Sequence, residues 1–392
     1  MTRWDAGHPG SCAVCGSRLK RNGKTSSGRV RWRCIACGSS SVKSRPDVAH
    51  AAELAEFLDW VLGNAAQRVL DNCSGRTFRN QHSWCWQVQP VVVITGEIYD
   101  EIQVDGTYLC HGWCLLTAVN KRGEVINWQW CNKESTAAYK ALIAPIPPPQ
   151  VVICDGGLGF HSAAKELWPE TKIQRCLVHV QRNIFTYVTR NPRTEAGKAM
   201  RKLALSLTKV KTPEDAGQWL IALEAWHQLY GNLINEKTFA NSEGAQRPTW
   251  AKADSNWWWT HDRLRRAWNL LHGLVKRQQL FTYLNEEFIE LKISPTTNRI
   301  EGGTNCGIKD LLRRHRGMRS EHQRRAVDWW CYRHSPRPRP ESVFITPENF
   351  QKPKPRVRNE SEPTLGDYGT GIETLDGGDG IYIRKGWAGR SH

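Results

Sequence analysis

The stretch Val151–Ile184, VVICDGGLGFHSAAKELWPETKIQRCLVHVQRNI, decides the fold of this 392-residue chain. It reads as an apolar strand that ends at Asp155, then a helix, a second short strand and a second helix. Upstream, residues 101–109, 113–120 and 124–132 read as three short strands with turns between them. Three sequential strands followed by alternating helices and strands predict a mixed sheet flanked by helices.

Two carboxylates stand in strands predicted to lie at the centre of this sheet: Asp105 in IQVDGT (102–107) and Asp155 in VVICDGG (151–157). The topology matches the ribonuclease H-like fold, in which the first and fourth strands are neighbours, so the two side chains would lie side by side. Burial of a carboxylate is unfavourable unless it is paired or holds a cation. Mg²⁺ is bound by one or two carboxylates with phosphate and water, and two such ions can activate a water or a 3′-hydroxyl and stabilise the leaving oxygen in phosphoryl transfer.

The alternative for each aspartate is a turn, since Asp-Gly is the strongest hairpin dipeptide. Two Asp-Gly sites, each after a strand rich in valine and isoleucine, favour the metal interpretation. We also expect the glycines that follow Asp155 to let a substrate backbone approach closely.

A third candidate ligand is Glu301, in PTTNRIEGG (295–303). Asn298 precedes it by capping-box spacing, so the alternative is that Glu301 caps a helix start. A helical run with one basic face follows. Beside a metal site such a face would hold phosphates; the alternative is an ordinary solvated face. Its basic residues are Lys309, Arg313, Arg314 and Arg316.

The N-terminal part carries two close cysteine pairs, Cys12 with Cys15 and Cys34 with Cys37, and a glycine follows each pair. This is the zinc-ribbon pattern, in which two knuckles each give two thiolates to a tetrahedral Zn²⁺. The alternative is two pairs of reduced structural cysteines. A unit this small has too little core to fold without a metal, which favours zinc.

Residues 51–92 predict two helices joined by a short turn, which resembles a helix-turn-helix. The first helix has apolar residues at helical spacing between Leu54 and Val61. The second carries Arg76 and Arg79, which we expect to contact DNA. The alternative is a plain helical hairpin that packs on the next domain.

The charge of the chain favours a polyanionic partner. It has 55 Lys and Arg against 38 Asp and Glu, a formal net charge of +17. It has no run of eighteen apolar residues and no apolar signal segment. These features argue against a membrane partner and predict a soluble intracellular protein.

Taken together, these residues resemble the DDE transposases of bacterial insertion sequences, in the Mutator-like superfamily. The resemblance covers roughly residues 10–335 and rests on the motifs Val104–Thr107, Cys154–Gly157, Arg175–Asn183 and Thr297–Met318. It implies that Asp105, Asp155 and Glu301 bind two Mg²⁺ or Mn²⁺ ions. It also marks Cys176 and His179 as a family signature, whose chemical role the sequence leaves open.

The resemblance implies an α/β multidomain architecture. Its expected parts are a zinc ribbon (10–45), a helix-turn-helix region (51–92), a ribonuclease H-like core in two parts (98–190 and 293–335), an all-helical insertion between them (191–292) and a disordered tail (336–392). The N-terminal modules would read terminal inverted repeats. The tryptophans Trp250 and Trp257–Trp259 would either stack on flipped or single-stranded bases or form the core of the insertion.

The implied reaction is metal-dependent cleavage and strand transfer of DNA, with no covalent protein–DNA intermediate. The partners would be the element's ends, target DNA and further copies of the chain on paired ends, in the bacterial cytoplasm on the nucleoid. Two rival functions are a domesticated DNA-binding regulator without catalysis and a related nuclease that cuts without transfer. The presence of all three carboxylates favours an active enzyme.

Overall fold

The computed structural model describes residues 11–12, 14–26, 28–41, 46–64, 75–109 and 112–350. The chain divides into two compact units. One comprises Met1–Val93 and Asp310–Asn359, and the other comprises Ile94–Lys309 and Glu360–His392. Most of the predicted disordered tail, from residue 351 onward, lies outside the described residues.

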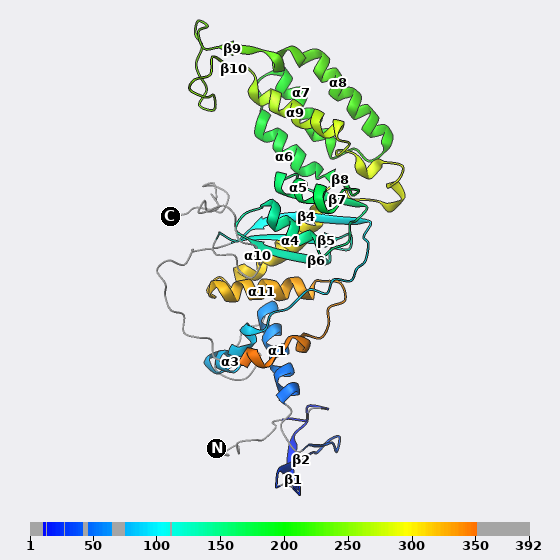
Figure 1. Cartoon of the computed structure of the whole chain (residues 1–392), viewed down its shortest axis with the longest axis vertical. Helices are drawn as coiled ribbons and strands as arrows, with labels where there is room; N and C mark the ends of the chain where they lie inside the picture. The colour runs from blue at the N-terminus through cyan, green and yellow to red at the C-terminus, as the bar shows by residue number, and fades with distance from the viewer. Residues whose placement is uncertain are drawn as a thin grey trace. The chain divides into compact units, whose positions relative to one another are not determined.

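The second unit is built on a five-stranded mixed sheet with the order β6-β5-β4-β7-β8 (Figure 1). The three strands that come first in the chain are antiparallel, whereas β7 pairs parallel with β4, and β8 pairs parallel with β7. This confirms the predicted mixed sheet. The strands are β4 (Glu101–Tyr108), β5 (Cys114–Asn120), β6 (Val125–Cys131), β7 (Val151–Cys154) and β8 (Lys172–Arg175).

Two apolar clusters cover the two faces of this sheet, because side chains alternate along each strand. On one face, Val104 and Cys154 pack with α4 (Thr136–Ile143) and α5 (Leu158–Leu167). On the other face, Ile153 packs with α6 (Leu177–Val188). Since Asp105 follows Val104 within β4, its side chain is directed to the other face, the one covered by α6.

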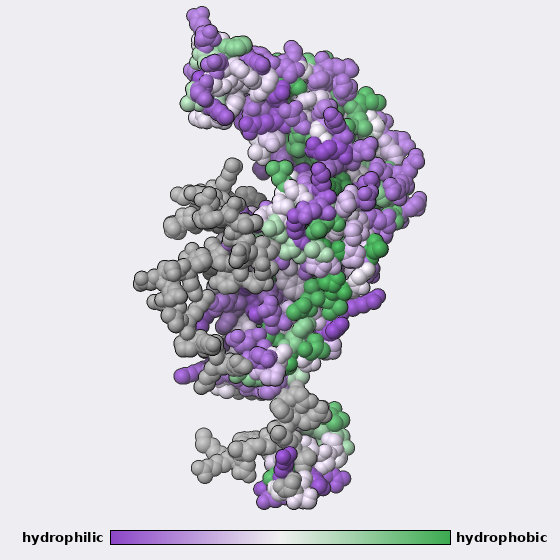
Figure 2. Space-filling view, viewed as in Figure 1, coloured by the Kyte–Doolittle hydropathy of each residue, from purple (hydrophilic) through white to green (hydrophobic). Residues whose placement is uncertain are grey.

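Residues 191–292 form a mainly helical segment that packs on α6. Its helices are α7 (Glu195–Leu207), α8 (Pro213–Asn235) and α9 (Asp262–Lys276), with 3-10 turns at Thr282–Leu284 and Ile289–Leu291. Thr212 and Asp215 form a reciprocal capping box that starts α8. In Figure 2 the visible surface of this segment is mainly hydrophilic, so its apolar residues are directed inward.

The prediction that this segment is entirely helical is wrong. A short antiparallel hairpin, β9 (Lys237–Phe239) with β10 (Trp257–Trp259), separates α8 from α9. The physical reason is the run of three tryptophans, since aromatic side chains favour strands and pair across them.

The first unit begins with a small three-stranded sheet of β1 (Leu19–Lys24), β2 (Val30–Cys34) and β3 (Ser40–Ser41). It continues with α1 (Pro46–Leu62), α3 (Gly75–Gln81) and the 3-10 helix η1 (Ser83–Gln87). The predicted apolar face of the first helix is confirmed, since Leu54, Phe57, Leu58 and Val61 are all buried. The turn predicted before the second helix falls within residues 65–74, outside the described residues.

The C-terminal helix α11 (Ser320–Arg333) belongs to this first unit and contacts α1. The sequence predicted residues 293–335 as one part of the catalytic core, but the boundary between the units lies between Lys309 and Asp310, inside α10 (Asn305–Arg314). The chain beyond α11 also differs from the prediction of disorder. Residues Glu341–Phe344 and Pro347–Phe350 form 3-10 turns, and Phe344 packs edge-on against Trp329 and Tyr332.

Among the described residues, no helix combines the length and the apolar character needed to cross a lipid bilayer.

Candidate functional site

The two aspartates occupy matching positions on two neighbouring strands, Asp105 within β4 and Asp155 directly after β7. The parallel register of β4 with β7 pairs Val104 with Cys154, so the next residues, Asp105 and Asp155, lie side by side. The turn interpretation is wrong for Asp105, because β4 continues without a break to Tyr108. At Asp155 the chain leads into α5 and does not return as a hairpin.

Asp105 is buried, with 8% of its surface exposed, and accepts a hydrogen bond from Asn305 Nδ2 at 3.1 Å. Burial and the neighbouring Asp155 carboxylate raise the pKa of Asp105 to about 7, with smaller contributions from Glu134 and Glu301, against the opposite effect of His179. The carbonyl oxygen of the Asn305 amide has no partner among the described residues. Crowded carboxylates beside an unpaired amide oxygen are the donor set that a hard divalent cation requires.

Glu301 lies in the π-helix Arg299–Thr304, which leads directly into α10. Its carboxylate accepts a hydrogen bond from Thr297 Oγ1 at 3.1 Å and pairs with Arg182 Nη1 at 2.9 Å. Asn298 makes no side-chain capping bond, so the interpretation of Glu301 as a helix cap is wrong. π-helical turns often occur at functional sites, and this one also accommodates the glycines that follow Glu301.

A short connecting segment, Ser294–Thr297, anchors the π-helix to the sheet. The amide of Ser294 donates to Glu101 Oε2 at 2.8 Å, and the amide of Leu177 donates to the carbonyl of Pro295 at 3.0 Å. Glu101 is fully buried, and Gln103 Nε2 donates to its other oxygen at 2.8 Å, so both carboxylate oxygens have a partner. Residues distant in sequence are thereby held beside the ends of β4 and β7.

Cys176 and His179 join this anchor to Glu301. The amide and hydroxyl of Thr297 lie 3.3 and 3.2 Å from Cys176 Sγ, and His179 Nδ1 lies 3.6 Å from Glu301 Oε1. The ligand atoms of Cys176, His179 and Glu301 all lie within 4.8 Å of one another. The pair predicted as a family signature is therefore in direct contact with the third carboxylate.

The charges of this pair follow from its contacts. The Cys176 thiol raises the pKa of His179 to about 9, helped by Glu301 and Asp105 and opposed by burial. Burial would raise the pKa of Cys176, but hydrogen bonds with His179 and Thr297 outweigh it and lower that pKa. At neutral pH a cationic imidazolium thus lies beside Glu301, and it offsets part of the repulsion among the carboxylates.

Gly156 does not have the role that the sequence predicted for it. Its φ is +93°, a conformation that favours glycine, and the space that a side chain would occupy is filled by the Arg175 guanidinium. Arg175 also donates to the backbone carbonyl of Asp155. The glycine therefore admits Arg175, which holds the Asp155 backbone, and does not leave a gap for a substrate backbone. The next glycine amide, that of Gly157, donates to Asp155 Oδ1 at 2.9 Å.

Glu134 is a site residue that the sequence analysis missed. It follows β6 in the loop before α4, and Tyr139 Oη donates to its Oε2 at 2.7 Å. Burial raises the pKa of Glu134, and Asp155 raises it further, while Tyr139 opposes the shift. No motif marks this residue in the sequence. The one signal is an acidic side chain directly before the helix cap Ser135.

The four N-terminal cysteines form a group whose sulfur atoms all lie within 4.8 Å of one another and can hold a metal ion. Cys12 Sγ lies 3.5 Å from Cys37 Sγ, and Cys15 Sγ lies 3.4 Å from Cys34 Sγ, with no disulfide formed. A hydrogen bond with Ser39, together with backbone amides, lowers the pKa of Cys12 to about 6, which favours the thiolate that a metal requires.

The glycine after each cysteine pair has the positive φ expected of a tight knuckle, +70° at Gly16 and +72° at Gly38. The structure therefore confirms that the four cysteines come together in a group that could hold a metal ion.

The residues predicted to bind DNA differ in their surroundings. Arg76 is exposed on α3, and Arg316 is exposed after α10. Arg313, in contrast, forms a surface ion pair with Asp310. Arg314 donates to the carbonyls of Leu62 and Gly63 at the end of α1, so its role within this unit is to satisfy a helix terminus. Arg79 is exposed on α3 and Lys309 is half-buried in α10.

The tryptophans differ in their burial, and only Trp258 among Trp257–Trp259 is a core residue. Trp258 is buried, whereas Trp257 and Trp259 are half-buried and meet edge-on with their ring centroids 4.9 Å apart. Lys237 lies over Trp257 at 4.1 Å, and Arg265 lies over Trp259 at 3.8 Å. Cations thus already occupy a face of each ring.

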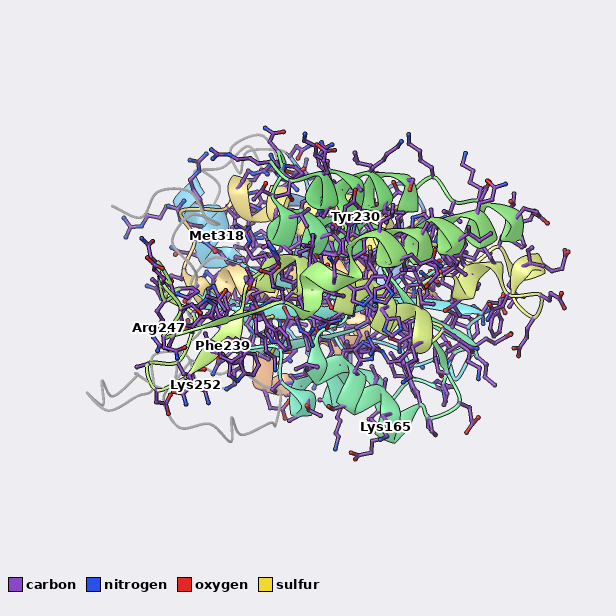
Figure 3. The ribbon with its side chains drawn as sticks, turned by 90° about the horizontal axis from the view of Figure 1, so that it is seen from above. Lys165, Tyr230, Phe239, Arg247, Lys252 and Met318 are labelled. Carbon is purple, nitrogen blue, oxygen red and sulfur yellow. The ribbon has the colours of Figure 1, made fainter. Side chains whose placement is uncertain are left out.

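Trp250 is more accessible, with 47% of its surface exposed, and it lies in the loop between β9 and β10. Together with Tyr187, Arg193 and Arg263 it lines a hollow of about 700 Å³. In Figure 3, Phe239, Arg247 and Lys252 lie close together at one side of the view, where this hairpin and its loop project. The loop therefore presents cationic side chains near an accessible aromatic ring.

Comparison with known proteins gives one family. Residues 115–231 match the family model described as transposase, Mutator family. This segment of the chain is therefore similar to a Mutator family transposase domain. It is also similar to the transposase for insertion sequence element IS6120 of Mycolicibacterium smegmatis, with 26% identity over 139 residues, which are 34% of this chain and 41% of that relative. The similarity therefore spans less than half of the curated relative.

These comparisons confirm the predicted resemblance to a Mutator-like transposase of a bacterial insertion sequence. The matched Mutator family segment contains Asp155, Cys176 and His179, and also Glu134. Asp105 and Glu301 lie outside it, so their assignment rests on the geometry described above.

We expect Cys34→Ser to lower the zinc content of the purified chain from about one Zn²⁺ per chain to a small fraction, because a tetrahedral site that loses one thiolate binds far more weakly. Metal analysis by mass spectrometry checks this. The matched control is Cys306→Ser, an exposed cysteine on α10, which should leave the zinc content unchanged. A wild-type chain without zinc contradicts the assignment.

We expect the effect of Asp105→Asn on stability to depend on pH. In the folded chain without divalent metal, Asp105 releases its proton near pH 7, whereas an ordinary aspartate does so near 3.8. The folded state therefore binds more protons over this range, and the wild-type free energy of unfolding falls as the pH rises through it. The stabilisation by Asp105→Asn should grow by ~1–2 kcal/mol from pH 5.5 to pH 8.

Urea unfolding in Mg²⁺-free buffer, followed by tryptophan fluorescence, measures this difference. Asp100→Asn, in the exposed residue before β4, is the control and should show no such growth. A stabilisation by Asp105→Asn that is equal at the two pH values contradicts the account.

Proposed function

We propose that the chain is a DDE-type transposase that cleaves DNA and transfers strands at the terminal inverted repeats of an insertion sequence. The observation that carries this proposal is the pairing of Val104 with Cys154, which brings Asp105 beside Asp155. The Mutator family domain supports it independently. Glu301 supplies the third carboxylate, held close enough to Asp105 to affect its pKa.

The fold of the catalytic core is proposed to be ribonuclease H-like. The strand order, with three antiparallel strands followed by two parallel ones, supports this. The helical segment 191–292 would then be the insertion that separates Asp155 from Glu301. The core would end within α10, since the rest of that helix belongs to the other unit.

Asp105, Asp155 and Glu301 would hold two Mg²⁺ or Mn²⁺ ions. Bound there, the ions would activate a water or a 3′-hydroxyl and stabilise the leaving oxygen. The residues around them have separate tasks. Arg175 fixes the backbone of Asp155, while Arg182 and His179 orient Glu301 and offset its charge.

DNA would be bound through several parts of the chain. The net charge of +17 favours contact with phosphates. We propose that a Zn²⁺ ribbon and the α1–α3 region, with Arg76 and Arg79, read the inverted repeats, and that Lys309 and Arg316 contact the backbone. Trp250 is the aromatic side chain best placed to stack on an unpaired base. The enzyme would act as a homo-oligomer on paired ends, on the nucleoid of a bacterium.

Two alternative functions would use the same DNA-binding residues. A regulator derived from a transposase would bind the same DNA without cutting it, and a nuclease would cut without transfer. The three carboxylates and the groups that hold them are all present, which favours the active enzyme over the regulator. Cleavage and transfer share one metal site, so a joining assay separates transposase from nuclease.

We expect Asp155→Ala to lower Mn²⁺-dependent cleavage of DNA that carries the flanking inverted repeats by at least about 100-fold, because even loss of a supporting ligand can weaken metal binding that much. DNA binding should persist. Gel assays of cleavage and of mobility shift measure the two effects. Glu170→Ala, an exposed residue after α5, is the control and should cleave normally. Cleavage that survives in Asp155→Ala contradicts the proposed function.

A further inference from the structure

We infer that Glu134 is a fourth carboxylate of the metal-binding cluster and a ligand to a divalent cation beside Asp155. This inference rests on the proposed function, because it adds a residue to the same site. It comes from geometry that involves three glycines, a buried tyrosine and two unpaired polar atoms.

Gly106 provides the first observation. A side chain there would place its Cβ 2.6 Å from Glu134 Oε1, and no such contact occurs between real atoms. The φ of Gly106 is not positive, so the backbone does not require glycine at this position. The glycine leaves room for the present position of the Glu134 carboxylate, the end of a flexible side chain that a larger residue here would displace. It directly follows Asp105, and its missing side chain lets the Glu134 carboxylate lie against β4.

Gly157 provides the second observation. The point where its Cβ would stand lies 3.6 Å from Asp155 Oδ1 and 3.9 Å from Glu134 Oε2. One position therefore faces carboxylate oxygens of both residues.

Glu134 is held in this position by buried neighbours. Tyr139, almost fully buried, donates to Glu134 Oε2 at 2.7 Å. A side chain at Gly159 would stand 2.9 Å from the Glu134 carbonyl, so this glycine lets α5 pack directly on the Glu134 backbone. The carboxylate is thus placed by the packing of α4 and α5, as a metal ligand has to be.

Two buried polar atoms near Asp105 point independently to a cation. Asn305 is 6% exposed, and its amide donates to Asp105 while its Oδ1 has no partner in the described part of the chain. Thr117 stands opposite Asp105 in the β4–β5 register, so its side chain is on the same face, and its buried hydroxyl is also unpaired there. Unpaired acceptors beside crowded carboxylates are the pattern that a hydrated cation satisfies.

The alternative is a purely structural role, in which Glu134 only accepts the hydrogen bond from Tyr139. This role does not explain why the side chain is charged. A neutral amide accepts the same hydrogen bond without adding charge to a cluster of carboxylates. Like charges at short range destabilise a fold unless a cation lies between them. The metal interpretation explains both the charge of Glu134 and the glycine at position 106.

Titration of the purified full-length chain with Mn²⁺, with free Mn²⁺ followed by electron paramagnetic resonance, tests the inference. Glu134→Gln keeps the size of the side chain and its bond to Tyr139, and we expect it to weaken Mn²⁺ binding about tenfold or more. Glu166→Gln on α5 is the matched control, a surface carboxylate that pairs with Lys140, and should bind as wild type. Without metal, Glu134→Gln should raise Tm, because a repulsion is removed.

Gly106→Ala is a second variant that keeps every charge but displaces the Glu134 carboxylate, and it should weaken binding as well. If Glu134→Gln binds Mn²⁺ as wild type does while Asp155→Asn does not, the inference is overturned and the proposed function stands. If the wild type binds no Mn²⁺ and shows no Mn²⁺-dependent cleavage, the proposed function itself fails.

Discussion

The parallel pairing of β4 with β7 is the constraint on which the rest of the proposed site depends. It sets Asp105, buried within β4, level with Asp155, which is half-buried directly after β7. Two anions so close raise the free energy of the folded chain. The surrounding structure supplies the compensation: an amide from Asn305, a guanidinium from Arg175 at the Asp155 backbone, and the imidazolium of His179.

The compensation for this charge comes from distant parts of the chain. Cys176 begins α6, and its sulfur accepts hydrogen bonds from Thr297, which in turn bonds Glu301. One small residue pair therefore fixes where the last carboxylate lies relative to the first two. This account gives the cysteine and histidine signature a physical task, the orientation of Glu301, which spacing in the sequence did not reveal.

The sequence predicted the strands and most helices of the sheet unit, because their apolar periodicity is local. It placed Asp105 and Asp155 on neighbouring strands, because the order of the elements matched the ribonuclease H-like sheet, and β4 and β7 are indeed neighbours. It missed Glu134, which lies in a loop where no periodicity applies, and whose hydrogen-bond partner Tyr139 is in α4. It also could not find the boundary inside α10, since periodicity shows which face is apolar but not which unit covers it. The sequence predicted that Arg314 binds phosphate for the same reason. Its acceptor Leu62 belongs to α1, far away in the sequence.

The anchoring of Ser294–Thr297 on the sheet has a consequence during synthesis. A ribosome delivers Asp105 and Asp155 long before Glu301 and Asn305, with the helical segment in between. A chain that ends before residue 293 contains every strand of the sheet. It lacks Glu301, the third proposed carboxylate, and Asn305, whose amide donates to Asp105. The order of the elements thus delays completion of the proposed site until synthesis has passed Asn305.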